Sequence, residues 1–169
     1  MLTSNILRLS KLENQEIIPS KTRFSLDEQL RQALLLLEGQ WSKKNIELDI
    51  ELMPALFYGN EELLLQVWLN LLGNAIKFTP HYGVVSVRLI ERTGQVTVAV
   101  SDTGIGIAPE AQPHIFEKFY QGDHTRAAEG NGLGLALVKR IVTLCHGAVS
   151  VESDTGEGAC FTVTLPNRE

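Results

Sequence analysis

Helical spacing of apolar residues predicts four helices along the chain. Within residues 61–78, apolar side chains recur every three or four positions, which places them on one face of a helix. Asn60 suits the N-cap of this helix, and Thr79 with Pro80 is expected to end it. The same spacing predicts helices at residues 2–13, 27–41 and 133–145.

Alternation of apolar and polar residues predicts strands in the rest of the chain. Residues 85–89 and 96–100 alternate and are separated by a turn at Thr93 and Gly94, which predicts a hairpin with one buried face. This order of elements predicts an α+β fold, a two-layer α/β sandwich with one sheet covered by helices on a single face. Further strands are predicted at residues 23–25, 46–50, 55–58, 149–151 and 161–165.

The N-terminal helix is predicted to be a separate unit. Its apolar stripe is short, Pro19 follows as a helix breaker, and isolated helices of this length are marginal in water. We therefore predict two units, residues 1–18 and residues 19–169. The first is expected to be the tail of a longer helix from a preceding domain, pairing with its own copy. The alternative is an N-terminal helix that packs on this same domain.

Composition is that of an ordinary globular domain, with 169 residues of which 44% are hydrophobic. The net charge of −5 argues against a nucleic-acid partner. No apolar run reaches membrane-spanning length and no signal-peptide pattern is present, so a cytoplasmic location is expected. Cys145 and Cys160 lack metal-ligand or redox-motif spacing, which predicts buried thiols in a reducing compartment.

A polar stripe runs along the predicted helix at residues 61–78. Its members recur every fourth residue, so they lie above one another on one face. Amide oxygens are suitable ligands for Mg²⁺ together with substrate phosphates and water, and Lys77 lies close enough to reach a phosphate. A solvated polar face is the alternative. The stripe consists of Glu62, Gln66, Asn70 and Asn74.

A carboxylate followed by two glycines stands at the end of a predicted strand. Asp102 there can accept a hydrogen bond from an exocyclic amine such as adenine N6, which favours adenine over guanine. Gly104 and Gly106 allow positive φ and close approach to a flat base, and Ile107 offers apolar contact. An ordinary Asp-x-Gly turn is the alternative.

A second glycine cluster, GNGLGL, precedes the last predicted helix. Helix N-termini present free N–H groups to anions, and Gly130, Gly132 and Gly134 would let a phosphate approach. This spacing is neither the dinucleotide fingerprint nor a P-loop, so it is a weak signal alone. The polar residues 120–129 just before it predict a lid over the nucleotide.

Together these motifs resemble the catalytic, ATP-binding domain of sensor histidine kinases, in the superfamily that also holds gyrase, mismatch-repair and heat-shock ATPases. The likeness covers about residues 22–166. QVWLNLLGNAIKFTP is similar to the family's N box, SDTGIGI to its G1 box, IFEKFY to its F box and GNGLGLALVKRIV to its G2 box. TGEGACF is similar to the last glycine box, and LTSNILRLSKLE to the end of the dimerisation and phosphoacceptor helix.

The resemblance implies a Bergerat ATP-binding fold with a mixed, mostly antiparallel sheet, and transfer of the γ-phosphoryl group of ATP to a histidine. It implies Asn74 as the Mg²⁺ ligand, assisted by Asn70, and Asp102 as the residue that holds adenine. Phe116 and Phe119 hold the lid in this interpretation, or are plain core aromatics. The resemblance also implies that nucleotide is bound by Lys77, Phe78, Gly104, Gly106, Ile107, Tyr120, Gly130, Gly132, Leu133 and Gly134.

One position separates the kinases from the ATP-hydrolysing members of the superfamily. Those members carry a glutamate as general base where this chain has Asn70, and a neutral amide activates water poorly. Two departures from the family pattern are Gln121, where arginine is common, and Asn131, where threonine or serine is common. Arg126 is a candidate replacement for the missing cation.

None of the four histidines stands in the family's phosphoacceptor context, so the acceptor is expected on a domain absent from this chain. We accordingly expect a piece of a longer, homodimeric protein, anchored in the membrane or not, that passes the phosphoryl group to a response regulator receiver domain. The alternatives are a nucleotide-binding interaction module without catalysis and an ATP-hydrolysing clamp. The histidines are His81, His114, His124 and His146.

Overall fold

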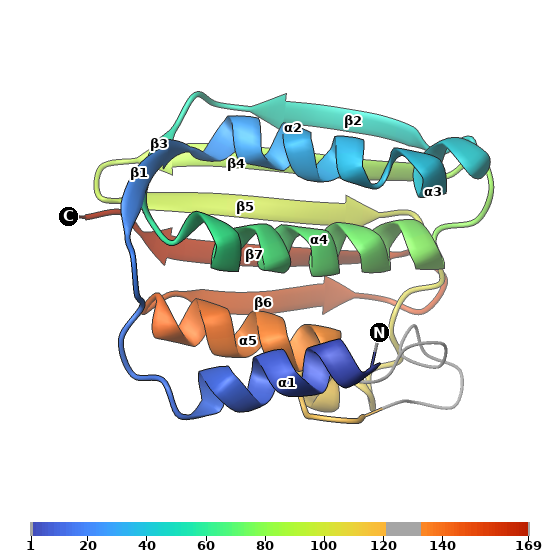
Figure 1. The fold of residues 1–169 in the computed structure, drawn as a ribbon. Helices are drawn as coiled ribbons and strands as arrows, with labels where there is room; N and C mark the ends of the chain where they lie inside the picture. Colours follow the sequence, from blue (N-terminus) through green and yellow to red (C-terminus); the bar gives the residue numbers. More distant parts are fainter. Residues whose placement is uncertain (1, 121–132, 169) are drawn as a thin grey trace.

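The computed structural model describes residues 2–120 and 133–168, which form a two-layer sandwich (Figure 1). The described helices are α1 (Leu2–Glu13), α2 (Leu26–Leu36), α3 (Glu38–Lys43), α4 (Glu61–Phe78) and α5 (Gly134–Leu144), with a short 3-10 turn at Gln112–His114. The strands are β1 (Thr22–Ser25), β2 (Glu47–Leu52), β3 (Leu56–Gly59), β4 (Val84–Arg92), β5 (Gln95–Asp102), β6 (Ala148–Ser153) and β7 (Ala159–Pro166).

The main sheet has five strands in the order β2-β4-β5-β7-β6. Only the β2–β4 pair is parallel, and the other neighbouring pairs are antiparallel. The helices lie on one face of this sheet, as Figure 1 shows. The predicted α+β sandwich with a mixed, mostly antiparallel sheet is therefore confirmed.

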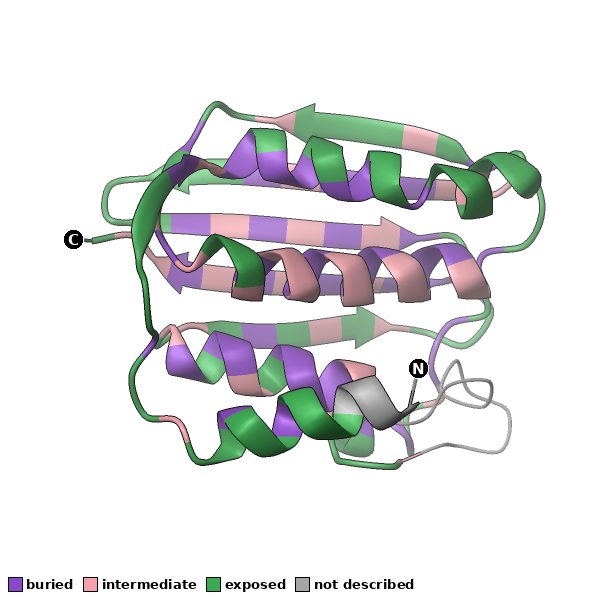
Figure 2. Cartoon of the chain, in the orientation of Figure 1, coloured by how far each residue is buried: buried purple, intermediate pink, exposed green. Residues whose placement is uncertain are grey.

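The core lies between the sheet and the helix layer, where the apolar stripes meet (Figure 2). Along β5, Val96, Val98 and Val100 are buried, while the residues between them are only half-buried on the open face. Trp68 of α4 is fully buried, and its indole N–H donates to Gln29 Oε1 of α2 at 2.8 Å. The alternation of apolar and polar residues in the sequence therefore correctly predicts which face of β5 is buried.

Local signals define the ends of α4, the helix that carries the polar stripe. Asn60 is its N-cap, and the side-chain oxygen accepts a hydrogen bond from Leu63 N–H at 2.9 Å. At the other end Thr79 adopts an extended conformation before Pro80, and the helix stops at Phe78. Both predicted ends of this helix are confirmed.

Two details differ from the sequence predictions. The helix predicted at residues 27–41 is interrupted at Leu37, which separates α2 from α3. Strands β1 and β3 do not join the main sheet but pair with each other in a separate two-stranded sheet. In addition, β2 is one of the two edge strands of the main sheet, and its residue Ile50 is 41% exposed.

Helix α1 packs against α5, which is the second of the two arrangements considered for it. Leu9 and Leu12 are buried in the common core. Arg140 of α5 donates to the carbonyl oxygens of Leu12 and Gln15 at 2.8 and 2.6 Å, and Lys118 forms an ion pair with Glu13. Continuation of this helix into a preceding domain stays a prediction.

Both cysteines lie in the described part of the chain and are free thiols. They are only partly buried, so the prediction of buried thiols is right for their chemistry and too strong for their exposure. Burial raises the pKa of the Cys145 thiol to about 11. That thiol is therefore protonated at neutral pH and is a poor nucleophile.

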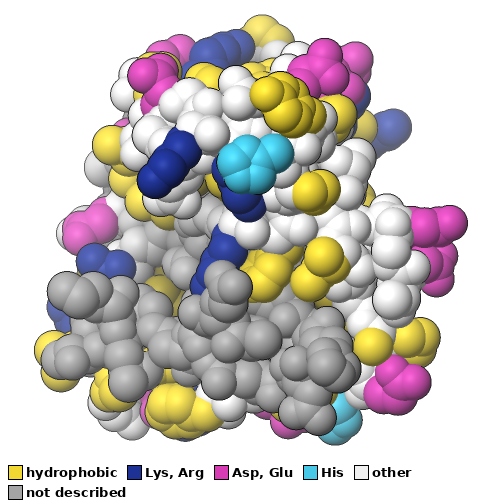
Figure 3. Space-filling view, turned by 90° about the vertical axis from the view of Figure 1, so that its right-hand side faces the viewer, with side chains coloured by type: hydrophobic (Ala, Val, Ile, Leu, Met, Phe, Trp, Pro, Cys, Tyr) yellow, Lys and Arg dark blue, Asp and Glu magenta, His cyan; other side chains and the backbone are white. Residues whose placement is uncertain are grey.

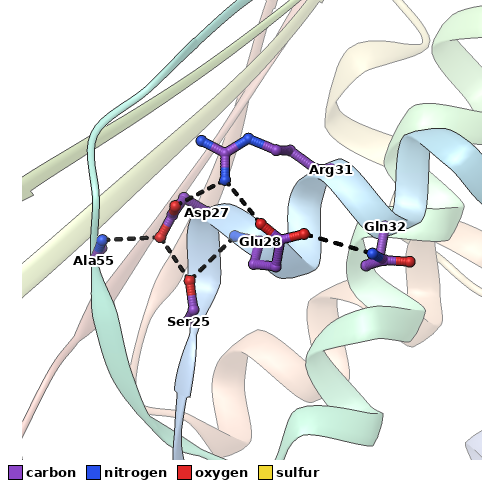
Figure 4. A network of polar contacts seen from close by, with 6 residues as sticks. All are labelled: Ser25, Asp27, Glu28, Arg31, Gln32 and Ala55. Carbon is purple, nitrogen blue, oxygen red and sulfur yellow. Dashed lines mark hydrogen bonds and ion pairs between the residues drawn. The ribbon is translucent and has the colours of Figure 1, made fainter.

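A buried carboxylate joins the start of α2 to the loop before β3 (Figure 4). Asp27 Oδ1 accepts hydrogen bonds from Ala55 N–H at 3.0 Å and from the Ser25 hydroxyl at 2.8 Å, and Oδ2 accepts one from Arg31 at 2.9 Å. Burial opposes ionisation, but these donors outweigh it and lower the pKa of Asp27 to about 2 from an ordinary value of 3.8.

This carboxylate makes the stability of the fold depend on pH. A depressed pKa in the folded state stabilises the fold fully above pH 3.8, and the stabilisation is lost as the pH falls through about 2. Between pH 6 and pH 2 we expect a loss of about 2 kcal/mol from this group. Urea unfolding of Asp27→Asn should show a correspondingly flatter pH profile, whereas Asp49→Asn, at an exposed ion pair, should keep the wild-type slope. Equal slopes in all three proteins would contradict the prediction.

Candidate functional site

Three segments from different parts of the sequence meet at one end of the sandwich, on the right in Figure 1. They are the C-terminal end of α4, the end of β5 with the loop after it, and the start of α5. Antiparallel pairing with β4 and β7 fixes where β5 ends, because Asp102 pairs with both Val85 and Ala159. The fold therefore brings the described parts of the three predicted motifs to the same end of the sandwich.

The C-terminal half of the polar stripe lines a cavity of about 550 Å³ between α3 and α4. Asn70, Asn74 and Lys77 all face this cavity. The N-terminal half of the stripe does not line this cavity. Its members Glu62 and Gln66 line a smaller cavity next to α1. The stripe predicted as one surface thus divides between two environments.

The orientation of Asn70 is fixed by its own helix. Its side-chain NH₂ donates to the carbonyl oxygen of Gln66 at 2.8 Å, which turns the amide oxygen away from α4. That oxygen faces the first residue of α5, since a Cβ built on Gly134 would lie 2.7 Å from Asn70 Oδ1. Because Gly134 has no side chain, Asn70 of α4 and the start of α5 can lie next to each other.

The cavity is electropositive. Apart from Lys77, it is lined by Lys43, Lys44 and His81, and no aspartate or glutamate is among its described lining residues. Figure 3 shows this end of the molecule, with basic side chains and a histidine near the centre and acidic side chains toward the edges. Such a field favours an anionic ligand. Sequence reasoning missed Lys43 and Lys44 because they precede the strand β2 and show no motif.

The carboxylate at the end of β5 lies where the motif predicts. Asp102 is 7% exposed, and its Oδ1 accepts a hydrogen bond from Gly104 N–H at 2.9 Å. It does not line the basic cavity. Ile107 is fully buried in the core, so its side chain contributes to packing.

The two glycines after Asp102 have a role inside the protein that the sequence did not reveal. A Cβ on Gly104 would lie 2.3 Å from the carbonyl oxygen of Phe78, and one on Gly106 would lie 2.2 Å from that of Asp154. Gly106 has the expected positive φ of 75°, whereas Gly104 does not. The sequence analysis predicted that a base would approach these glycines closely. In the structure, backbone carbonyl groups of the chain itself occupy these close positions.

The end of α4 is joined directly to this glycine loop. The N–H of Ile105 donates to the carbonyl oxygen of Phe78 at 3.3 Å. The ammonium of Lys77 lies 5.4 Å from the centre of the Phe78 ring. Lys77 and Phe78 are therefore held next to the Asp102 loop, as expected if one ligand contacts both.

The aromatic residues of the F box differ in their environments. Phe116 packs edge-on against the core residue Phe161, with ring centres 6.2 Å apart, which favours the core interpretation for it. Phe119 is 59% exposed. Tyr120 stacks on His114 at 5.5 Å. Leu133 is buried and precedes α5 as its N-cap residue.

Several predicted residues lie outside the described part of the chain. They are Gly130 and Gly132 of the G2 box, most of the proposed lid at residues 120–129, and His124, Gln121, Arg126 and Asn131.

Residues 59–169 match the family model for histidine kinase-, DNA gyrase B- and HSP90-like ATPases, and the chain belongs to this family. The match confirms the family that the motifs predicted.

Among the described residues, no helix is long and apolar enough to span a bilayer.

Relatives are named as sensory kinases. The chain is 36% identical over 168 residues to the adaptive-response sensory kinase SasA of Gloeothece citriformis, with 98% of this chain and 43% of the relative covered. It is 34% identical over the same length to the sensor-like histidine kinase SenX3 of Mycobacterium bovis, of which 41% is covered. The chain thus spans less than half the length of these relatives.

A solved structure of a similar protein carries a nucleotide analogue. It is the crystal structure of full-length ShkA in complex with AMPPNP, with a TM-score of 0.87 and 34% sequence identity. The comparison covers 98% of this chain and 35% of that one. The fold predicted from the sequence is therefore shared with that protein.

Proposed function

We propose that this chain binds ATP with Mg²⁺ and donates the γ-phosphoryl group to a histidine on a separate phosphoacceptor domain. The observation that carries this proposal is the meeting of three motifs at one end of the sandwich: the amides of α4, the Asp102 loop and the start of α5. Membership of the family and the likeness to sensory kinases support it.

The Asp102 loop would hold the purine. A buried carboxylate selects a ligand that offers an N–H group, and adenine N6 does so whereas the guanine carbonyl repels it. Phe78, at the end of α4, is held beside this loop by the bond from Ile105 N–H. An aromatic ring in this place offers apolar contact to a base.

The donor set of the cavity fits a magnesium ion bound together with phosphates. Among the residues that the structure describes, no group of three or more His, Cys, Asp or Glu could hold a metal by itself. The Asn70 amide oxygen faces the start of α5, and Asn74 lines the cavity one turn further along α4. Neutral oxygen ligands of this kind suit Mg²⁺ when a substrate supplies the remaining oxygens. The bound ion would neutralise charge on the phosphates.

The protein's other contribution to transfer is positioning and charge. Lys77 faces the cavity from α4, and the start of α5 lies beside Asn70. A cation and a helix N-terminus both stabilise phosphate oxygens. Phosphoryl transfer requires mainly positioning and electrostatic stabilisation. Asn70 supplies no base to activate water, so we propose transfer to a histidine rather than hydrolysis.

The partners follow from the same proposal. The acceptor histidine lies on a phosphoacceptor domain of the same kinase, and a response regulator receiver domain takes the phosphoryl group onward. The full-length protein is a homodimer in this proposal, because α1 is similar to the end of a dimerisation helix. We propose a cytoplasmic location for this domain.

The transfer is tested by mixing the chain with radiolabelled ATP, Mg²⁺ and a separately purified phosphoacceptor domain. The expected result is label on the acceptor, acid-labile as a phosphohistidine is, with little free phosphate released. Nucleotide binding without label on any acceptor would favour a non-catalytic binding module. Rapid release of phosphate would favour an ATP-hydrolysing enzyme.

Replacing Asn74 by alanine should remove the dependence of nucleotide binding on magnesium. The wild-type affinity for ATP is expected to drop by about tenfold or more when Mg²⁺ is chelated, whereas the affinity of Asn74→Ala should be low under both conditions. Calorimetric titrations measure this. Gln32→Ala, at an exposed amide on α2 that does not line the cavity, is the matched control and should keep the wild-type metal dependence. An Asn74→Ala protein that still responds to Mg²⁺ would rule out this ligand.

A further inference from the structure

The ammonium group of Lys44 lies at the C-terminal end of α4, across from the Asp102 loop. Its Nζ donates to the carbonyl oxygens of Ile76, Lys77 and Thr79 at 2.8, 2.9 and 2.7 Å. An ammonium has three protons, and three acceptors lie within hydrogen-bond distance. Lys44 therefore has its full set of partners on the last turn of α4 and its C-cap residue Thr79.

The last carbonyl groups of any helix lack partners inside the helix. Here each one has a partner. Ala75 O accepts from the Thr79 hydroxyl at 2.6 Å, Phe78 O accepts from Ile105 N–H, and the remaining two, of Ile76 and Lys77, accept from Lys44, which also binds the carbonyl oxygen of the C-cap residue Thr79. The end of α4 is thus held from two sides, by Lys44 on one and by the glycine loop on the other.

Lys44 is itself fixed by the chain around it. It follows directly after α3, and its carbonyl oxygen accepts a hydrogen bond from Tyr82 N–H at 2.9 Å. Gly83 O then accepts from Glu47 N–H at the start of β2. These bonds connect the α3–β2 turn to the loop that follows α4, so the ammonium is presented from a well-defined backbone.

The residues whose carbonyl groups Lys44 binds include one that carries a predicted ligand-binding side chain. Lys77 is one of the residues that line the basic cavity, and Phe78 follows it next to the Asp102 loop. A shift of this last turn would move both side chains relative to Asp102. A positive charge at a helix C-terminus is also favourable, because the helix dipole is negative there.

We propose that Lys44 is a positioning residue for nucleotide binding: its ammonium holds the last turn of α4 so that Lys77 and Phe78 face one ligand together with Asp102. This inference rests on the proposed function, and it assigns a role to a residue that carries no family motif. Within the part of the chain that the structure describes, the hydrogen bonds of the Lys44 ammonium all go to backbone carbonyl groups, so it acts through the residues that it holds.

The test uses Lys44→Met, which keeps most of the length of the side chain and removes all three donors. We expect the Kd for MgATP to rise by about tenfold, equivalent to about 1.4 kcal/mol, at a temperature where the variant is fully folded. Amide hydrogen exchange should accelerate at Ile105, whose N–H is bonded to Phe78. Lys44→Arg, which keeps the charge and several donors, should recover part of the affinity. Lys11→Met, at an exposed lysine on α1, is the matched control and should bind as the wild type does.

The outcomes separate this inference from the function on which it rests. If the wild-type chain fails to bind nucleotide, the proposed function is wrong. If the wild type binds and Lys44→Met binds equally well with unchanged exchange at Ile105, even with a lower Tm, Lys44 is only a structural cap and the inference is overturned.

A measurement on the wild-type chain keeps the inference testable if Lys44→Met does not fold. The Lys44 ammonium should give a resolved nitrogen–proton NMR signal, protected from exchange, with couplings to the carbonyl carbons of its three acceptors. Addition of MgATP should shift this signal, because the ligand contacts the turn that Lys44 holds. A signal without those couplings, or one that saturating nucleotide leaves unmoved, would overturn the inference.

Discussion

Replacing Asp102 by asparagine is expected to weaken ATP binding by roughly 100-fold, which is about 2.7 kcal/mol, while the fold remains intact. The carboxylate is buried, and a hydrogen bond between a ligand and a buried charge is among the stronger ones. Asparagine keeps an oxygen for the N–H of Gly104, so the loop should be preserved. What it loses is the charge that favours an amine donor on the base.

The measurement is a pair of titrations, one with ATP and one with GTP, on the wild type and on Asp102→Asn. The preference for ATP over GTP should shrink in the variant, because an amide can also donate to the guanine carbonyl. Asp49→Asn, on the edge strand β2, is the matched control and should preserve both affinities. Unchanged ATP affinity in a folded Asp102→Asn protein would show that this carboxylate does not hold the base.

Replacing Gly104 by alanine is expected to destabilise the fold by about 3 kcal/mol. The added Cβ would lie 2.3 Å from the carbonyl oxygen of Phe78 and 2.9 Å from its carbon. These are backbone atoms at the end of α4, so relief requires the helix end or the loop to move. That movement also breaks the hydrogen bond from Ile105 N–H.

Urea unfolding monitored by the buried Trp68 measures this loss. The control is Gly39→Ala on α3, where an added Cβ meets nothing within 4 Å. That variant should be stabilised by about 0.5–1 kcal/mol, because alanine restricts the unfolded chain and suits a helix. If Gly104→Ala were as stable as the wild type, the loop could not pack against Phe78 as described.

Much of the architecture could be predicted because hydrophobic periodicity is strong in the helices and strands that contribute most residues to the core. The hairpin of β4 and β5 and the helix α4 appear where alternation and helical spacing predict them. The break at Leu37 could not be predicted, since apolar residues continue at helical spacing across it. The pairing of β1 with β3 was also hidden, because a short strand does not reveal its partner.

The candidate site was predictable as a set of motifs but not as an arrangement. The spacing along α4 places Asn70, Asn74 and Lys77 on one face, and the structure shows them around one cavity. Lys44 lies 32 to 35 residues away from the carbonyl groups that it binds, and no local pattern links them. Likewise, the contact of Gly104 with Phe78 depends on tertiary packing between α4 and the end of β5.

The contact between α1 and α5 has a practical consequence for how this domain is studied. A shortened chain that started at residue 19 would lose the carbonyl groups that Arg140 binds and the carboxylate that Lys118 binds. It would also expose the surface of α5 that Leu9 and Leu12 cover. Measurements of nucleotide affinity made without the first eighteen residues would therefore describe a domain whose last helix has a new, water-exposed apolar side.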